Sequence, residues 1–243
     1  MNRRTWGAGV LLSVGLLCTP AVAGADQLFG LWGGAFFVRG FDSRTSGDVL
    51  VENLLPARDP FVYEIRDFDG GQVGGEYLIG FGDWIEAGVG IGFYQRTVPS
   101  FYADSVHPDQ TDITQDIKVR IVPVSATVRF FPTGRTTPVQ AYVGGGVNFY
   151  RWHYSEAGEF IDYSNPNAFP LPTFRDKFED NGTAAGPVFL AGVRAPFAQD
   201  RFMVGGEFRW QGGAGDLDPL QNFTGDKLDL GGYSLVGTFH VRF

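Results

Sequence analysis

Three side chains suited to nucleophilic chemistry lie close together near the middle of the chain. His153 and Ser155 are two positions apart, and Glu156 follows the serine directly, with Glu159 nearby. A serine becomes a nucleophile when a histidine accepts its proton and a carboxylate orients that histidine. His153 and Ser155 would share one face of an extended strand. However, the predicted strand ends at Tyr154 and no oxyanion hole can be identified, so we assign no catalytic residue and predict no enzyme activity.

A larger set of ionisable side chains recurs at alternate positions of otherwise apolar segments. These residues share their parity with small and polar residues, opposite a row of large apolar side chains, so they point to one face of their strands. If the strands close into a barrel with its apolar face outward, the polar face lines the lumen. The predicted luminal polar network consists of Glu76, Glu86, Arg96, Arg129, Arg194, Glu207, Arg209, His240 and Arg242.

Charged groups in a narrow lumen must pair, because an isolated buried ion is costly. Eight strands leave an interior that side chains just fill. We therefore favour a salt-bridged plug over a gated polar path for a small solute. Glu207 and Arg209, two apart on one face, each need a further partner, and Glu86 and Arg194 are the candidates.

Metal, cofactor and nucleic-acid chemistry have little support in the sequence. Asp216 and Asp218 would offer a divalent ion too few ligands, and no zinc-spaced Cys/His set or phosphate-binding glycine motif occurs. The formal charge is −8, and it becomes −10 (17 basic against 27 acidic residues) once Arg3 and Arg4 are removed. We expect no cofactor, no metal and no nucleic-acid partner.

The segments that would position these groups alternate between apolar and polar side chains. Short connections at 82–83, 133–137 and 198–200 separate some of them, and long ones at 42–69, 99–115, 155–184 and 212–226 separate the others. Short turns on one side and long loops on the other are typical of outer-membrane barrels. We predict an all-β fold, an eight-stranded antiparallel up-and-down transmembrane β-barrel. Its strands are expected at 28–41, 71–81, 84–98, 116–131, 138–154, 186–197, 201–211 and 231–243.

Two places in this pattern are irregular. Apolar residues occupy both parities of 28–41, so the faces of the first strand stay unassigned. In 116–131 the apolar row changes parity near Ile121 and Val122, which predicts either a β-bulge or a strand that continues above the membrane. Within the first long loop, Val49–Leu55 favours a short helix that caps the barrel.

The start of the chain has the features of an export signal. Asn2, Arg3 and Arg4 form a basic start, an apolar run covers 10–17, and Ala21-Val22-Ala23 is a small-residue cleavage site. The apolar run is shorter than the ~20 residues of a spanning helix. We predict a signal peptide at 1–23, with cleavage after 25 as an alternative, and a barrel domain at 24–243. The only Cys, Cys18, leaves with the signal peptide.

The last strand carries a pattern of its own. Alternate residues back from the C-terminus are apolar with aromatics at both ends, whereas the intervening residues are largely polar. The pattern resembles the C-terminal signal that the assembly machinery of outer-membrane barrels reads before the last strand pairs with the first. The residues that form this predicted assembly signal are Tyr233, Leu235, Phe239, Val241 and Phe243.

The mature chain as a whole resembles the small eight-stranded outer-membrane proteins of the OmpA/OmpX/OmpW-like group. The signal peptide, the Gly-rich alternating strands and the terminal TFHVRF carry the resemblance. It implies location in the bacterial outer membrane, contact with lipid and lipopolysaccharide, and interaction with the barrel-assembly machinery during biogenesis. Arg151 at the rim would contact lipopolysaccharide phosphates. The group's fold does not dictate its function.

We expect a closed barrel with a structural or surface-interaction role in the cell envelope and an unidentified extracellular ligand at most. The first alternative is OmpW-like passive transport of small hydrophobic molecules, for which Phe160, Phe169, Phe174 and Phe178 would line the entrance unless they pack the loops together. The second alternative is a lipid A-modifying hydrolase, because His153, Ser155 and a nearby Glu are similar to the Ser, His and Glu of outer-membrane lipid A deacylases.

Overall fold

The computed structural model describes residues 26–243 except 56–58 and 165–169. The predicted signal peptide therefore lies outside the described residues. Eight long strands form the body of the molecule. They are β1 (Gln27–Val38), β3 (Gly70–Phe81), β4 (Ile85–Val106), β5 (Asp112–Phe130), β6 (Gln140–Ile161), β7 (Thr173–Phe197), β8 (Phe202–Gln211) and β11 (Gly232–Arg242).

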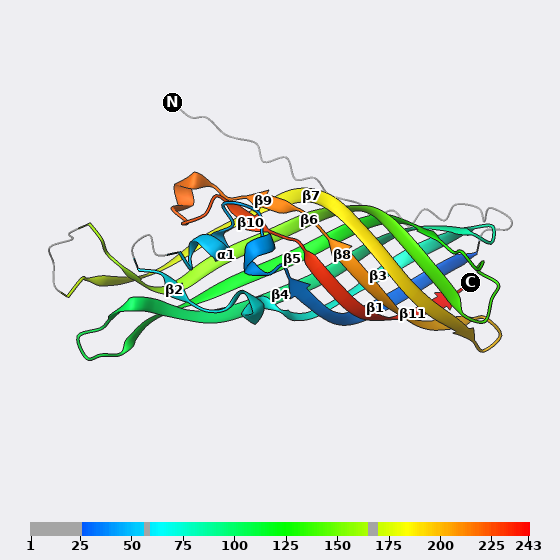
Figure 1. The fold of residues 1–243 in the computed structure, drawn as a ribbon, viewed down its shortest axis with the longest axis horizontal. Helices are drawn as coiled ribbons and strands as arrows, with labels where there is room; N and C mark the ends of the chain where they lie inside the picture. The colour runs from blue at the N-terminus through cyan, green and yellow to red at the C-terminus, as the bar shows by residue number, and fades with distance from the viewer. Residues whose placement is uncertain (1–25, 56–58, 165–169) are drawn as a thin grey trace, which may run out of the picture.

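These strands form one closed ring (Figure 1). Each long strand pairs antiparallel with the next long strand of the chain, and β1 closes the ring by pairing with β11 from Leu28↔Arg242 to Val38↔Gly232. The predicted eight-stranded antiparallel up-and-down barrel is confirmed. Strand pairing also gives β1 its faces: Leu28, Trp32 and Phe36 point inward and are buried, whereas Leu31 points outward and is 55% exposed.

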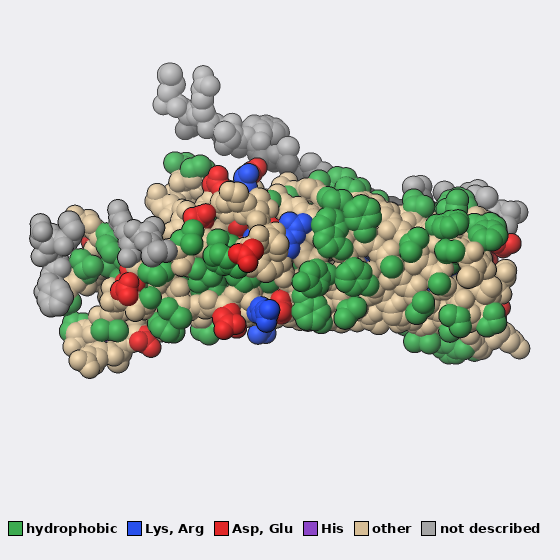
Figure 2. Space-filling view, viewed as in Figure 1, with side chains coloured by type: hydrophobic (Ala, Val, Ile, Leu, Met, Phe, Trp, Pro, Cys, Tyr) green, Lys and Arg blue, Asp and Glu red, His purple; other side chains and the backbone are tan. Residues whose placement is uncertain are grey.

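A belt of apolar side chains surrounds the half of the barrel that carries the C-terminus (Figure 2). On β4 it extends from Ile85 to Phe93, close to the about 9–11 residues that a tilted strand needs to cross a bilayer. Exposed aromatic rings mark both edges of the belt, as in membrane barrels. They are Phe81, Trp84, Phe130, Phe197 and Phe239 at the edge with short turns, and Phe93, Phe149, Phe189, Phe208 and Tyr233 at the other.

Above the belt the strands are longer than predicted. β4 and β5 extend to a turn at 107–111, and β6 and β7 pair as far as Ile161↔Thr173. The predicted loops at 99–115 and 155–184 are therefore wrong over most of their length. The alternation does not stop at Pro99: Ser100 and Tyr102 remain buried and Phe101 remains outward, since Pro99 occupies an ordinary ladder position opposite Asp116.

β5 has no bulge at the predicted change of parity. Its pairing with β6 is continuous there, through Ile121↔Trp152 and Val122↔Arg151. The apolar row changes side because the surroundings change: below this point lipid is outside the wall, whereas above it water is outside. Ile117 and Ile121 therefore point inward and are buried at 0% and 2% exposure. The alternative prediction, a strand continuing above the membrane, is confirmed.

The long connections between strands cover the end of the barrel that is remote from the C-terminus (Figure 1). The predicted helix forms as α1 (Val49–Glu52), and Val49 and Leu50 are fully buried. The same connection contains η1 (Phe41–Ser43), β2 (Phe61–Val62) and η2 (Ile65–Phe68). The predicted loop at 212–226 is not simply a loop, because it holds η3 (Pro219–Gln221) and β9 (Ala214–Asp216), which pairs with β10 (Lys227–Asp229).

Among the described residues, none of the helices has the length and hydropathy that crossing a membrane requires.

Beneath α1, buried side chains of the strands form the largest apolar cluster of the described chain, and the helix completes it. Its members at the centre include Phe36, Phe68, Tyr94, Ile117, Ile121, Tyr150, Trp152 and Leu228. The lumen is therefore polar at the level of the belt and apolar above it.

Candidate functional site

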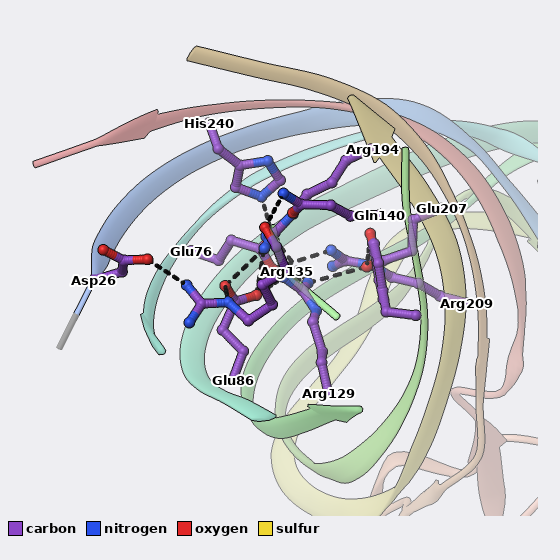
Figure 3. Close-up of polar contacts among 11 residues, drawn as sticks. Asp26, Glu76, Glu86, Arg129, Arg135, Gln140, Arg194, Glu207, Arg209 and His240 are labelled. Carbon is purple, nitrogen blue, oxygen red and sulfur yellow. Dashed lines mark hydrogen bonds and ion pairs between the residues drawn. The ribbon is translucent and has the colours of Figure 1, made fainter. Parts of the chain in front are cut away.

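An ionic network fills the lumen at the level of the apolar belt (Figure 3). Its centre is Arg129 on β5, whose side chain is 1% exposed. Nη2 of Arg129 donates to Glu76 Oε2 on β3 at 2.7 Å and to Glu207 Oε2 on β8 at 3.0 Å. One guanidinium therefore links three strands across the interior, where charge-assisted hydrogen bonds are strong.

A second pair lies towards the end with short turns. Both terminal nitrogens of Arg194 on β7 donate to the carboxylate of Glu86 on β4, at 2.9 and 3.0 Å, and both side chains are fully buried. Nε of Arg194 donates to Gln140 Oε1 at 2.8 Å. Arg135, from the turn between β5 and β6, approaches Glu86 to 3.4 Å and contacts Asp26 at 3.2 Å.

A histidine, a tyrosine and one further arginine complete the network. Nε2 of His240 lies 2.9 Å from Glu76 Oε1, and the hydroxyl of Tyr142 donates to Glu207 Oε2 at 2.8 Å. Arg209 pairs with Glu207 and lies 3.3 Å from Glu76. The network contains four carboxylates and four guanidinium groups, namely Asp26, Glu76, Glu86 and Glu207 with Arg129, Arg135, Arg194 and Arg209.

Glycines make the space for these side chains. Gly30 on β1 is paired directly with His240, and a Cβ there would overlap the imidazole ring. A Cβ at Gly80 would overlap the guanidinium of Arg135, which donates from Nη1 to the carbonyl of Gly82 at 2.8 Å. At Gly30 the close approach of the imidazole ring favours glycine, whereas at Gly80 the end of the flexible Arg135 side chain occupies the space that a Cβ would take.

Little empty space remains beside the network. The guanidinium of Arg209 lies over the ring of Trp32, 4.2 Å from its centroid, which closes the network on the extracellular side. The cavity lined by Trp32, Glu76 and Arg209 has a volume of about 20 Å³, close to that of a single water-sized sphere. Farther up, the apolar cluster under α1 begins with Phe36 and Tyr94, whose ring centroids are 4.9 Å apart.

The predicted luminal residues are not all part of this network. The structure brings Glu76, Glu86, Arg129, Arg194, Glu207, Arg209 and His240 together. Arg96 is not part of the network: it lies above it on β4, paired with Val119 of β5, is exposed, and donates to the carbonyl of Asp67 at 2.8 Å. Arg242 is peripheral, with Nε 3.9 Å from Asp26.

Partners within the network also differ from the prediction. Glu207 and Arg209 find their further partners in Arg129 and Glu76, whereas the suggested Glu86 and Arg194 pair with each other. Parity gives the face of a residue but not its height, and the register between strands decides the height. Four residues of the network were not predicted from the sequence: Asp26, Arg135, Gln140 and Tyr142. Of these, Arg135 lies in a predicted turn.

The candidate nucleophile group is not assembled. Glu156 points into the barrel, where Asn53 and Tyr154 donate to its Oε1 at 2.8 and 2.5 Å, while His153 and Ser155 have the opposite parity on β6. No hydrogen bond links His153 to Ser155 in the described part of the chain. Burial and nearby Arg120 lower the pKa of His153, which weakens it further as a base.

The remaining predicted residues lie on the outside or in the upper loops. The predicted assembly signal faces outward at Tyr233, Leu235, Phe239 and Phe243, with Val241 half-buried on the same face. Arg151 is exposed beyond the apolar belt. Asp218 caps η3 by accepting from the amide of Leu220 at 2.9 Å. Within the described residues, no three His, Cys, Asp or Glu side chains are grouped so that they could hold a metal.

The aromatic residues of the third long loop pack together around Phe160. Its ring centroid lies 6.0 Å from that of Phe174 and 4.9 Å from that of Phe178. Phe169 lies outside the described residues. Phe160 and Phe178 also line a cavity at this end of the barrel. The structure thus shows that the rings pack against one another, and their role as an entrance stays a prediction.

A second buried ionic cluster, which the sequence did not predict, ties the loops to the last strands. Arg44 donates to Asp48 at 2.5 and 3.2 Å, and the amide of Asp229 donates to Asp48 Oδ1 at 2.6 Å. Asp229 in turn pairs with Arg39 at 3.3 Å and accepts from the amide of Thr45. Burial raises the pKa of Asp48 although Arg44 favours its ionised form. The cluster holds α1 in place over the barrel.

No protein-family model matches the chain, and no curated protein matches it. Solved structures with similarity include the N-terminal β-barrel domain of Pseudomonas aeruginosa OprF, with 11% identity, a TM-score of 0.40, and coverage of 90% of this chain and 97% of that one. Neisserial surface protein A has 13% identity and a TM-score of 0.47, with 90% and 99% covered.

The attachment invasion locus protein Ail of Yersinia pestis, solved in complex with the heparin analogue sucrose octasulfate, has 14% identity and a TM-score of 0.38, with 90% and 98% covered. The assignment of the fold rests on the chain's own strand order and on its apolar belt with aromatic edges. By these two features, the chain is an eight-stranded β-barrel of the outer-membrane kind.

Proposed function

We propose that the protein is a closed outer-membrane barrel with a structural and surface-interaction role in the cell envelope. The observation that carries this proposal is the ionic network around Arg129, which connects β3, β5 and β8 across the lumen. A network that joins opposite walls stabilises the barrel and leaves no continuous water-filled path. It is therefore suited to a rigid support for extracellular loops and strands rather than to a channel.

The closure has two layers. The ionic network occupies the level of the membrane, and the apolar cluster with Phe36, Tyr94 and Trp152 fills the lumen above it. An ion entering from outside would have to displace the apolar cluster first and the salt bridges next. The first step would expose apolar side chains to water, and the second would leave buried charged groups without their partners.

Above the membrane the barrel wall continues as two long hairpins, β4–β5 and β6–β7. They extend beyond the belt to Val106 and Ile161, and His107 at the tip of the first contacts Glu159 on the second at 2.8 Å. Such a paired platform presents a defined surface for contact with other molecules, which supports the surface-interaction part of the proposal.

Lipopolysaccharide is the proposed partner around the barrel. Lys118, Arg120 and Arg151 face outward on β5 and β6 just beyond Val124 and Phe149 of the apolar belt. Cations at this level are suited to phosphate groups of the surrounding lipid. Lipopolysaccharide should therefore raise the unfolding temperature of the wild type more than that of an R120Q/R151Q variant. The variant R175Q, whose side chain is 82% exposed far above the belt, serves as the control.

Liposome swelling tests the closed barrel against a barrel with an open polar path. Refolded protein, whose folding is checked by heat-modifiable gel migration, is incorporated into liposomes that are then diluted into small sugars and amino acids. We expect swelling no faster than in protein-free liposomes. Swelling that increases with the amount of protein and depends on solute size would show an open path and contradict the proposal.

A further inference from the structure

A cavity of about 410 Å³ lies at the extracellular end of the barrel, above the apolar cluster. It is bordered by the segment after α1, by β2, by the upper parts of β4, β6 and β7, and by residues 222–224. Its rim is open to solvent, since Leu55 is 39% exposed. The cavity is separate from the luminal network described above.

The polar group of this cavity is the carboxyl of Glu156. Glu156 is only 6% exposed, and Asn53 and Tyr154 both donate hydrogen bonds to its Oε1. Asn53 is itself held by Thr224. No described Lys or Arg forms an ion pair with Glu156, in contrast to the paired carboxylates of the lumen. Burial raises the pKa of Glu156, because the ionised form has lost water without gaining a counterion.

The walls of the cavity are largely aromatic. Phe61 and Tyr102 meet edge to face with their centroids 5.0 Å apart, and Phe223 lies 5.1 Å from Tyr154, a donor to Glu156. The rings that line the cavity are Phe61, Tyr102, Phe160, Tyr163, Phe178 and Phe223. Aromatic faces attract cations through their quadrupole, most strongly where water is excluded.

The charged side chains among the described residues that line the cavity have one sign. Glu52 and Asp59 lie on its lining together with Glu156, and the described lining residues include no Lys or Arg. This disfavours an anionic ligand. A bare divalent ion is also disfavoured, because it needs six or more oxygen ligands and the described residues form no group of three metal-ligating side chains.

We propose that this cavity binds a small organic cation, an alkylated or quaternary ammonium compound, whose charge meets Glu156 and whose apolar groups contact the aromatic walls. The ligand supplies the positive charge that none of the described residues places beside Glu156. This inference adds a ligand class to the surface-interaction role and does not depend on the closure of the lumen.

Calorimetric titration of the refolded protein with choline tests the proposal. The neutral isostere 3,3-dimethylbutan-1-ol has the same shape without the charge. The protein is held in a maltoside detergent, because phosphocholine detergents carry the proposed ligand group themselves. We expect choline to bind with one site per chain and at least about tenfold more tightly than the neutral isostere.

Glu156→Gln keeps the shape of the carboxyl and its acceptor oxygen but removes the charge. It should weaken choline binding about tenfold or more and leave the isostere unaffected. Glu159→Gln is the matched control, because it makes the same charge change three residues along β6 at a side chain that pairs with His107 and Arg175 instead. This control should bind choline like the wild type.

Phe223→Leu is the second variant and removes one aromatic wall without touching Glu156. It should weaken choline binding severalfold, so the proposal stays testable if Glu156→Gln does not fold. Absence of choline binding at millimolar concentration, or equal binding of choline and the isostere, would overturn the proposal. Liposome swelling by the same preparations tests the closed lumen separately, because neither variant alters the luminal network.

Discussion

Arg194 and Glu86 meet across the lumen although 108 residues separate them in the chain. The guanidinium donates two hydrogen bonds, at 2.9 and 3.0 Å, and joins β7 to β4. Arg135 approaches the same carboxylate from a turn at 3.4 Å. Arg129 lies 4.0 Å from it, so Glu86 has three cationic partners, whereas Arg194 has one anionic partner.

The two members of this pair should have unequal effects on stability. Glu86→Ala leaves Arg194 and Arg135 without their shared carboxylate and should lower the free energy of unfolding by about 3–5 kcal/mol. Arg194→Ala should cost less, because Arg135 still faces Glu86. Urea unfolding in lipid vesicles, followed by tryptophan fluorescence, measures both. Glu179→Ala, at a half-exposed side chain far from the lumen, should change stability by less than about 0.5 kcal/mol.

The double variant Glu86→Ala/Arg194→Ala should be less destabilised than the sum of the two single variants, because removal of both partners leaves fewer unpaired charges. Equal costs for the single variants together with simple additivity would show that the two side chains contribute independently, in contradiction to the bidentate pair.

Apart from the first strand, the faces of the strands could be predicted from the sequence, and the partners across the lumen could not. Seven of the nine predicted luminal side chains meet in one network, because side-chain parity is a local property that alternation reveals. The ion pairs depend on register, shear and the curvature of the closed sheet, which are global properties. The sequence could not assign Arg135 to the lumen, because a residue in a turn has no strand parity from which its face could be inferred.

The upper half of the molecule was predicted less well, for a different physical reason. Where the strands leave the membrane, the outer surface of the barrel wall is in contact with water. Beyond this level the apolar side chains point into the barrel, and the change of side occurs at Ile121 and Val122. If the apolar side chains are assumed to face outward along the whole length of a strand, the strands are predicted to end too early. The cavity beside Glu156 was missed because its walls come from five separate segments of the chain.

The contact between Gly30 and His240 predicts a steric requirement. Gly30→Ala places a methyl group against the imidazole and should lower stability by about 1–3 kcal/mol. The control is Gly33→Ala, where the nearest atom, Val73 Cγ1, is at an ordinary 3.5 Å. Urea unfolding of both variants checks the prediction, and a second substitution, His240→Ala, should recover part of the loss at position 30. If His240→Ala restores none of the stability lost in Gly30→Ala, contact with the imidazole is not the cause of that loss.

Glu156 predicts a dependence of stability on pH. Burial raises the pKa of its carboxyl, so the folded protein holds this proton more tightly than the unfolded chain does. The resulting contribution to stability is lost as the pH rises from the ordinary pKa of a Glu to the raised value. Glu156→Gln should therefore raise the unfolding temperature near about pH 8 and have little effect near about pH 4. The opposite trend would mean that the ionised carboxylate has a stabilising partner.

The closed lumen is the central claim, and planar-bilayer conductance of the refolded wild-type protein tests it most directly. The ionic network and the apolar cluster above it predict no steady single-channel current at any applied voltage that the bilayer withstands. The variant Arg129→Ala, which removes the link between β3, β5 and β8, should unfold more readily and is the comparison. Steady, unit-sized conductance in the wild type would contradict the account.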